Sequence, residues 1–290
     1  PKASSPCSIA AGVCTAFNFV DTHIWNAFTP KVGLQWNPDS STNVYAYWTK
    51  GFRSGGYNLR QTNLLAPPGP YDQEVENSYE FGFKKGLFDR KLSVNMAFFQ
   101  NDYKDLQRAI FQSSPVIGIS QTTVNSADTR IRGIEGEVAA RPAAGLRLGG
   151  HFGYLHNHWK QIYFHLSGPG PVTPADYDLQ LPFLSPWSYG LNFSYERPVG
   201  TSKLTLQASF DHRDSTPSND ANTGILKAVN RIDASVLLKM ANGVGISAYG
   251  KNLTNQTTYG LNNPLSFTPG ETIAPLNKGR ILGVELRYSF

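Results

Sequence analysis

The last twelve residues, GRILGVELRYSF, constrain the fold of this chain more than any other segment. Apolar side chains occupy every second position, at Leu282, Val284, Leu286, Tyr288 and Phe290, and Gly, Glu, Arg and Ser lie between them. Successive side chains of a β-strand point to opposite faces. The period of two therefore predicts a terminal strand whose two faces meet different surroundings, one apolar and one polar.

The same alternation recurs along almost the whole chain and predicts eleven strands. Its clearest example is the segment KLTLQASFD, in which Leu204, Leu206, Ala208 and Phe210 alternate with polar residues. The strands are expected at about residues 28–36, 43–55, 79–84, 92–101, 133–140, 146–154, 188–196, 203–211, 231–239, 244–251 and 282–290.

The connections between these strands alternate strictly in length. The short ones are 37–42, 87–91, 141–145, 197–202 and 240–243, and the long ones are 57–75, 104–122, 162–181, 214–227 and 255–277. Outer-membrane barrels have short turns on the inner rim and long loops on the outer rim. A soluble β-sandwich has no reason to alternate its connections in this way. We therefore expect an all-β, antiparallel transmembrane β-barrel.

Composition agrees with this fold class. Only 16% of the residues are charged, against about 25% in soluble domains, and the chain has 14 Tyr, 17 Phe and 27 Gly. The sequence contains no run of about 18 apolar residues, so it predicts no membrane-spanning helix. A membrane-spanning β-strand, however, needs only about 9–11 alternating residues. The net charge of +5 includes no run of Lys and Arg, so nucleic acid is not an expected partner.

The loop pattern also predicts an orientation. The long loops would lie outside, the apolar faces would meet lipid, and the polar faces would line the lumen. Residues 1–24 would form an extracellular loop segment, and residues 25–290 would form barrel wall. Aromatic residues near strand ends are expected in the interfacial belts, namely Trp36, Trp48, Trp159, Trp187 and Tyr288.

Eleven strands do not close a bacterial barrel, because single-chain barrels of this kind have even strand numbers. An open sheet would leave edge N–H and C=O groups unsatisfied in lipid. Either one strand has been missed or split, or the chain is half of a 22-stranded barrel such as outer-membrane transporters use. The start at Pro1, without a signal peptide, favours a piece of a longer precursor.

Five stretches, in order and spacing, resemble the C-terminal barrel portion of the TonB-dependent outer-membrane receptors. They are YAYWTKGFRSGGYNLR, ENSYEFGFKKGLFDRKLSVNMAFFQNDYKDLQ, VNSADTRIRGIEGEVAARP, ISAYGKNLTNQTTYG and GRILGVELRYSF. Asn252, Leu253 and Tyr259 match the family's penultimate-strand pattern. The resemblance covers about residues 25–290. The plug domain, the TonB box and the first half of the barrel have no counterpart in this sequence.

This resemblance implies a receptor in the outer membrane of a Gram-negative bacterium. Such receptors take up a scarce, bulky nutrient, commonly a ferric siderophore, with energy from the TonB–ExbB–ExbD system. The implied partners are outer-membrane lipid and lipopolysaccharide, the TonB complex through a plug domain, the barrel-assembly machinery and an extracellular iron chelate. Tyr288 and Phe290 would form the C-terminal barrel signal. No cofactor is implied, and an enzyme is not expected.

Two groups of residues are candidates for ligand contact. Arg53, Tyr57 and Arg60 flank a Gly-rich turn where a strand enters its outer loop, and an Arg there can pair with a carboxylate or phosphate. The alternative is an Arg paired with a carboxylate of the plug or of a neighbouring strand. The same two readings apply to His212 and Arg213.

The segment HFGYLHNHWKQIYFH contains His156 and His158, which lie two residues apart on one strand face. Imidazoles in this arrangement could contact a metal or haem, but two His residues alone fix no geometry. Ordinary girdle or loop residues are the alternative. Cys7 and Cys14 are candidates for a local disulfide, with two unpaired thiols as the alternative.

Two other functions fit the strand pattern. A passive porin or substrate-specific channel would share the strands and the terminal Phe but would have no plug. An outer-membrane barrel hydrolase would need a nucleophile and a base near the outer rim. The sequence contains no GxSxG, HExxH or P-loop motif, which counts against the hydrolase.

Overall fold

The computed structural model describes residues 21–58, 69–114, 118–166, 170–261, 263–264 and 272–289. Four residues singled out in the sequence lie outside these ranges, namely Cys7, Cys14, Arg60 and Phe290. The candidate disulfide therefore stays a prediction.

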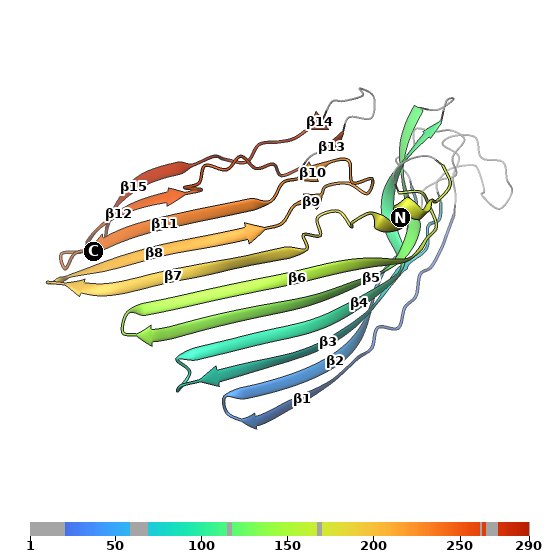
Figure 1. The fold of residues 1–290 in the computed structure, drawn as a ribbon. Helices are drawn as coiled ribbons and strands as arrows, with labels where there is room; N and C mark the ends of the chain where they lie inside the picture. The colour runs from blue at the N-terminus through green and yellow to red at the C-terminus, as the bar shows by residue number, and fades with distance from the viewer. Residues whose placement is uncertain are drawn as a thin grey trace.

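The chain forms one antiparallel sheet of eleven strands, as the alternation predicts (Figure 1). The eleven strands lie in the sheet in the order in which they occur in the sequence, and the short strands of the loops lie outside this sheet. The strands are β1 (Lys31–Asp39), β2 (Thr42–Arg53), β3 (Glu74–Leu87), β4 (Leu92–Ser114), β5 (Gly118–Ala143), β6 (Leu146–Ile162), β7 (Trp187–Val199), β8 (Ser202–Arg213), β11 (Val229–Lys239), β12 (Val244–Lys251) and β15 (Ile281–Tyr288).

All five short turns lie at one end of the sheet, together with the C-terminus, and the long connections lie at the other end (Figure 1). We call these ends the turn rim and the loop rim. The β1–β2 turn shows how the turn rim is stabilised. The carboxylate of Asp39 accepts hydrogen bonds from the Ser41 N–H at 2.7 Å and the Thr42 hydroxyl at 2.8 Å. Short polar side chains thus satisfy the turn backbone locally.

The two faces of the sheet differ as the sequence predicts. One register row joins Leu34, Ala46, Phe81, Phe98, Ile134, Tyr154 and Trp187 across seven strands, and we call this side the apolar face. Leu34 is 81% exposed and Val284 is 78% exposed. Large apolar side chains this exposed are expected where lipid, not water, covers the sheet. The opposite side, which carries Tyr45, Glu80 and Glu135, is the polar face.

The hairpin of β4 and β5 reaches much further than the sequence predicts. Most of the expected loop 104–122 belongs to these two strands, so that expectation is wrong. The physical reason is a register irregularity between Tyr103 and Leu106, where Asp105 has a φ of +57°. A β-bulge shifts the alternation by one residue, so the pattern beyond it no longer continues the pattern before it.

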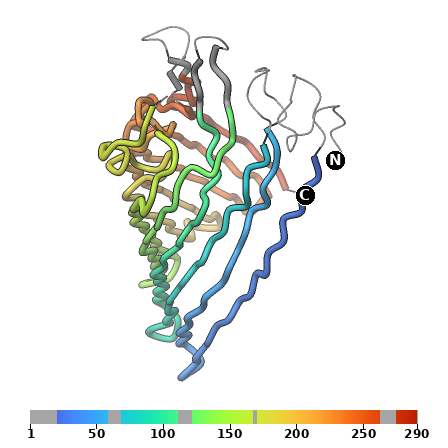
Figure 2. Tube along the Cα trace, turned by 90° about the vertical axis from the view of Figure 1, so that its right-hand side faces the viewer, coloured from blue at the N-terminus to red at the C-terminus, as the bar shows by residue number. Residues whose placement is uncertain are grey.

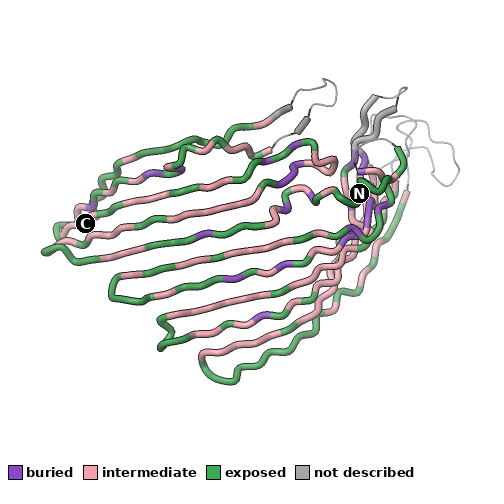
Figure 3. Tube along the Cα trace, in the orientation of Figure 1, coloured by how far each residue is buried: buried purple, intermediate pink, exposed green. Residues whose placement is uncertain are grey.

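The sheet is an open trough, with β1 and β15 as its two edges (Figure 2). The loop rim adds two short strand pairs, β9 (Thr216–Pro217) with β10 (Ile225–Leu226) and β13 (Asn263–Pro264) with β14 (Thr272–Ile273). It also holds the short 3-10 helix η2 (Pro174–Asp178). Buried residues gather mainly at the loop rim, and most strand residues are intermediate or exposed (Figure 3). Within the described ranges, no helix is long and apolar enough to cross a membrane.

Candidate functional site at the loop rim

The polar face carries side chains that bond across strands. The hydroxyls of Tyr45 and Tyr47 both donate to the Glu80 carboxylate, at 2.7 and 2.6 Å. Further along the sheet, the Asn95 amide donates to Glu137 at 3.3 Å. Polar residues at alternate positions are thus accounted for by hydrogen bonds to neighbouring strands. These carboxylates therefore need no catalytic role to explain their presence.

The loop rim is tied together by side chains of the long β4–β5 hairpin. Gln107 is 5% exposed, and its side-chain amide donates to the carbonyls of Ser54 and Asp72 at 2.9 and 3.0 Å. Asn58 exchanges two hydrogen bonds with the Thr123 backbone, at 2.9 and 2.8 Å. A buried amide with both donors satisfied fixes its neighbours in place. The β2–β3 loop is therefore attached to the hairpin.

Two further outer loops join the same assembly. The Arg108 guanidinium, on β4, lies 2.5 Å from the Asp220 carboxylate in the β8–β11 loop. Asn222 in that loop exchanges two hydrogen bonds with the Gln180 backbone in the β6–β7 loop, at 2.8 and 2.9 Å. The three connections thus form one contiguous surface at the loop rim.

A small apolar core lies beneath the β6–β7 loop. Its buried members are Ala127, Trp159, Ile162, Leu166, Leu181 and Leu184. The Trp159 side chain is 2% exposed, and its indole N–H donates to the Leu179 carbonyl at 2.6 Å. The expectation that Trp159 belongs to an interfacial belt is therefore wrong, because the loop folds back over it.

Asp176, in η2, fixes the conformation of this loop. The side chain is 1% exposed and accepts hydrogen bonds from the Thr173 N–H and hydroxyl at 2.7 and 2.9 Å, and from the Leu166 N–H at 3.3 Å. Burial acts to raise the pKa of Asp176, but these hydrogen bonds, with His165 at 3.5 Å, outweigh it and hold the pKa below its ordinary value.

We expect acid to loosen this loop before it affects the sheet. A carboxyl whose folded pKa is lowered stabilises the fold above its unfolded pKa, near 3.8, and that contribution is lost as pH falls through the folded value. Limited proteolysis of the protein from pH 7 to pH 2, with proteases active across that range, measures this. In Asp176→Asn the cleavage rate at pH 7 should rise about tenfold and lose most of its pH dependence, because about 1–2 kcal/mol of local stability is missing. An unchanged pH profile in Asp176→Asn would contradict this role.

Arg53 and Tyr57 lie on either side of the Gly-rich turn, as expected. Arg53 is exposed on the polar face, opposite Glu74 in the β2–β3 register. The Tyr57 hydroxyl donates to Asp21 at 3.0 Å. Gly55 permits the turn because a Cβ there would collide with the Tyr71 carbonyl oxygen.

The other candidates divide between the two faces. Arg213 lies on the polar face, between Ser188 and Val229 in register. His156 and His158, by contrast, share the face of Tyr154, which is the apolar face. His212 also lies on the apolar face, stacked on Tyr189 with ring centroids 4.5 Å apart. The structure therefore does not bring the three His residues to the polar side with the two Arg residues.

Metal binding has no geometric support in the part of the chain that the structure describes. Among those residues no group of three or more His, Cys, Asp and Glu side chains could hold an ion. The contacts that the sequence did not indicate are those of Gln107 and Arg108, which join segments far apart in the chain, and those of Asp176 within its own loop. The sequence signal closest to them is the T-x-x-D pattern at Thr173 and Asp176, which forms a capping box.

Comparison with known families identifies the protein family to which this sheet belongs. Residues 11–253 match the family model described as TonB dependent receptor-like, beta-barrel. The chain therefore belongs to the TonB-dependent receptor family. The expected fold class is confirmed, and so is the location in the outer membrane of a Gram-negative bacterium. The apolar face of this receptor barrel consequently meets lipid, the polar face meets the lumen, and the loop rim is extracellular.

Solved receptor structures share this fold at low sequence identity. The ferric yersiniabactin uptake receptor FyuA from Yersinia pestis is 18% identical with a TM-score of 0.72, over 90% of this chain and 37% of its own. The ferric preacinetobactin receptor BauA from Acinetobacter baumannii is 19% identical with a TM-score of 0.63, over 89% and 36%. The ferripyoverdine receptor of Pseudomonas aeruginosa is 15% identical with a TM-score of 0.61, over 90% and 33%. The chain thus spans about a third of the length of these receptors.

Proposed function

We propose that this chain is the C-terminal half of the barrel of a receptor that imports a ferric siderophore, with energy coupled through TonB. The observation that carries the proposal is the family match over residues 11–253 on an eleven-stranded open sheet, half of the 22 strands of outer-membrane transporters. Structural relatives that are ferric siderophore receptors support this class of cargo. A plug domain and the first half of the barrel would belong to the same whole protein.

The loop rim is the proposed contact surface for the cargo. Arg53 and Arg213 lie on the lumen-facing side near this rim, and Tyr57 lies in the adjoining loop. Guanidinium groups suit the carboxylate and catecholate oxygens of iron chelates. The three His residues on the lipid-facing side are not proposed as cargo contacts. The other proposed partners are the TonB complex through the plug, and the barrel-assembly machinery, which would recognise the C-terminal strand with Tyr288 and Phe290.

Iron uptake tests this proposal. A strain that lacks the whole gene is supplied with a panel of ferric siderophores as sole iron source, and uptake of radiolabelled iron is measured. We expect one chelate to be lost with the gene, restored by it, and lost again when TonB is removed. Arg213→Gln should weaken binding of that chelate about tenfold, because hydrogen bonds to charged groups contribute about 1.5–3 kcal/mol. Arg287→Gln, near the turn rim, is the matched control.

The alternatives predict different results in the same assay. Uptake that persists without TonB would identify a passive channel and contradict active transport. Growth that depends on none of the chelates would contradict the siderophore class. A barrel hydrolase is disfavoured because the family match is to transport receptors.

A further inference from the structure

Two adjoining hollows run along the polar face of β6, β7, β8, β11, β12 and β15. The upper hollow has a volume of about 580 Å³ and the lower one about 430 Å³. Gln207, Ser235 and Tyr249 line both, so the two hollows are continuous. The lower hollow ends at Gly243 and Ser289, which lie at the turn rim. We call the two hollows together the lumen groove.

The lumen groove begins below the proposed cargo contact Arg213. From the loop rim toward the turn rim, the polar-face side chains of β8 follow in the order Arg213, Asp211, Ser209 and Gln207. Ser209 and Gln207 line the groove. The groove therefore leads from the level below Arg213 to the inner mouth of the barrel.

Uncharged polar side chains line the middle of the groove. They are Asn192, Ser194, Gln207, Ser209, Ser235 and Ser247. Hydroxyl and amide groups exchange hydrogen bonds with a hydrated cargo, and they carry no charge that would hold it tightly. Passage along a pore requires this kind of weak binding at several positions.

The two carboxylates that line the groove are already engaged. Glu285 accepts a hydrogen bond from the Arg287 guanidinium at 2.7 Å. Asp233 accepts the Asn252 N–H at 2.7 Å and lies 4.0 Å from the Arg231 guanidinium. Their negative charges are therefore offset by neighbouring groups, and they oppose an anion in the groove only weakly.

The cations of the groove are less well compensated. Arg147, Lys239 and Lys251 line it and form no ion pair with the residues that the structure describes. Lys239 also stands directly opposite Lys203 in the β8–β11 register, and like charges in this arrangement destabilise a sheet. Glu196 lies 2.5 Å from Lys203 and offsets that charge. Lys239 is thus an uncompensated cation at the inner end of the groove.

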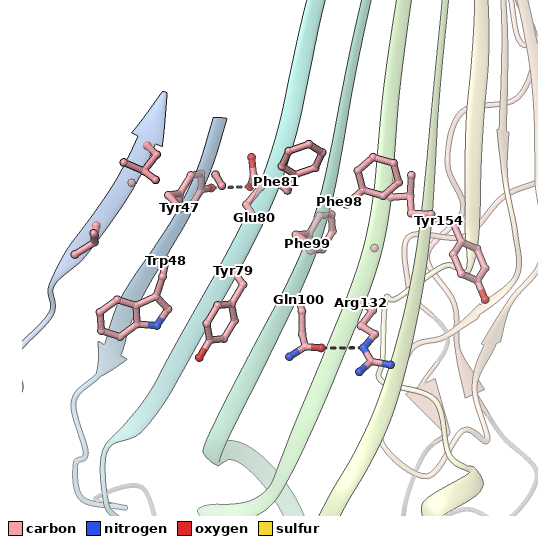
Figure 4. Close-up of a pocket in the computed structure, with 16 residues that line it drawn as sticks. Tyr47, Trp48, Tyr79, Glu80, Phe81, Phe98, Phe99, Gln100, Arg132 and Tyr154 are labelled. Atoms are coloured by element: carbon pink, nitrogen blue, oxygen red, sulfur yellow. Dashed lines mark hydrogen bonds between the residues drawn. The ribbon is translucent and has the colours of Figure 1, made fainter. Parts of the chain in front are cut away.

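The hollow on the other side of the lumen has the opposite charge balance. It has a volume of about 370 Å³, and its titratable lining side chains include Glu135, Glu137, Lys84 and His151. Above it the Tyr47 hydroxyl donates to Glu80 (Figure 4), and the Lys31 ammonium lies 4.4 Å from the centre of the Tyr47 ring, so these two charges are close together. Charge therefore favours an anion on the side of the lumen groove.

We propose that the lumen groove is the route by which an anionic cargo crosses the barrel, and that Lys251 and Lys239 bind it in succession. The cargo class is a ferric chelate with a net negative charge, carried by carboxylate or catecholate oxygens. Rings of Arg and Lys select anions in pores by the same attraction. The inference rests on the proposed function, to which it adds the charge of the chelate and the wall along which it moves.

Lys239→Gln in the full-length receptor separates passage from binding. The probe is the radiolabelled ferric chelate that the uptake panel selects. Its affinity is measured on cells without TonB, and its initial uptake rate on cells with TonB. We expect an unchanged affinity and an uptake rate about tenfold lower, because charge of one sign in a cleft raises the local concentration of its counter-ion by about that factor. Lys239→Arg keeps the charge and should retain the wild-type rate.

Lys84→Gln is the matched control, since it removes the same charge from the other side of the lumen. Its affinity and uptake rate should both equal those of the wild type. A selected chelate without net negative charge would overturn the inference. So would a lower affinity in Lys239→Gln, or uptake by this variant without TonB, because the lysine would then hold the outer site or the plug in place.

A bulky side chain in the middle of the groove tests the route independently of charge. Ser235 lines both hollows, so Ser235→Trp should lower the uptake rate at least as much as Lys239→Gln and leave affinity unchanged. Ala97→Trp, in the hollow on the other side, should leave both unchanged. Wild-type uptake in Ser235→Trp would overturn the route, and heat-modifiable migration shows that each variant folds. A wild type that takes up none of the chelates would instead contradict the proposed function itself, so the two failures are distinguishable.

Discussion

Residues 1–290 expressed alone, behind a secretion signal, are expected to give no closed barrel in the outer membrane. The sheet ends at β1 and β15, and all nine residues of β1 are exposed. About half of the backbone N–H and C=O groups of an edge strand have no partner in the sheet, and each costs several kcal/mol in lipid. Two such edges cost on the order of tens of kcal/mol, which exceeds the roughly 5–15 kcal/mol that stabilises a typical domain.

Electrophoresis of the membrane fraction with and without heating measures this result. A closed barrel migrates faster before heating than after, so residues 1–290 alone should show no shift, and the full-length receptor should show one. The same chain produced together with the proposed first half of the barrel is the matched control, and a partial shift is expected there. A shifted band from the chain alone would contradict the prediction. A shifted band of twice the chain mass would also contradict it, because two copies would then pair their edges into a closed barrel.

The fold could be predicted from the sequence because alternate residues of a membrane β-strand face lipid and lumen, and these two surroundings require apolar and polar side chains in turn. Most strands of the main sheet have the period of two, which distinguishes their lipid-facing side. The exception is β2, which carries aromatic residues on both faces, so that its lipid-facing side follows only from the register with its neighbours. Prediction failed on the β4–β5 hairpin, where Asp105 introduces the bulge. A single extra residue reverses the phase of everything beyond it, and no local pattern marks where the phase is restored.

The candidate site was harder to predict than the fold, for two physical reasons. Beyond the hydrocarbon layer the lipid-facing side becomes polar, so polarity no longer identifies the lumen. His156 and His158 lie two and four residues after Tyr154 and therefore share its lipid-facing side. The alternation of the strand, and not the polarity of imidazole, decides which side they face. The contacts of Gln107 and Arg108 join segments that are distant in sequence, and alternation carries no information about them.

We expect Trp159→Ala to open the β6–β7 loop while the spanning sheet stays intact. The indole fills the small core under the loop and donates its N–H to the Leu179 carbonyl at 2.6 Å. Removal of a buried Trp side chain costs about 3–5 kcal/mol. That loss is comparable to the whole stability of so small a core, so the loop should lose its fixed conformation. Limited proteolysis of full-length receptor in membranes should then show cleavage within residues 163–186 at least a hundredfold faster.

Two variants separate packing from other effects. Trp159→Phe keeps most of the apolar volume and loses only the hydrogen bond to Leu179, so its cleavage should rise about tenfold or less. Trp36→Ala removes an indole that is 65% exposed on the lipid-facing side of β1, and the loop should stay protected. Heat-modifiable migration should be the same in all three variants, because the strands themselves remain paired.

The effect of Trp159→Ala should also reach the neighbouring loop. Asn222 in the β8–β11 loop bonds the Gln180 backbone, and Asp220 pairs with Arg108 on the hairpin. Loss of the first contact leaves the β8–β11 loop held by the second, so cleavage within residues 214–228 should rise by a smaller factor than in the β6–β7 loop. If both loops of Trp159→Ala resisted the protease as well as those of the wild type, the prediction that the core around Trp159 holds the β6–β7 loop would be wrong. If the proposed siderophore binds at this surface, its affinity measured on the same protein then reports whether binding needs the loops held in this arrangement.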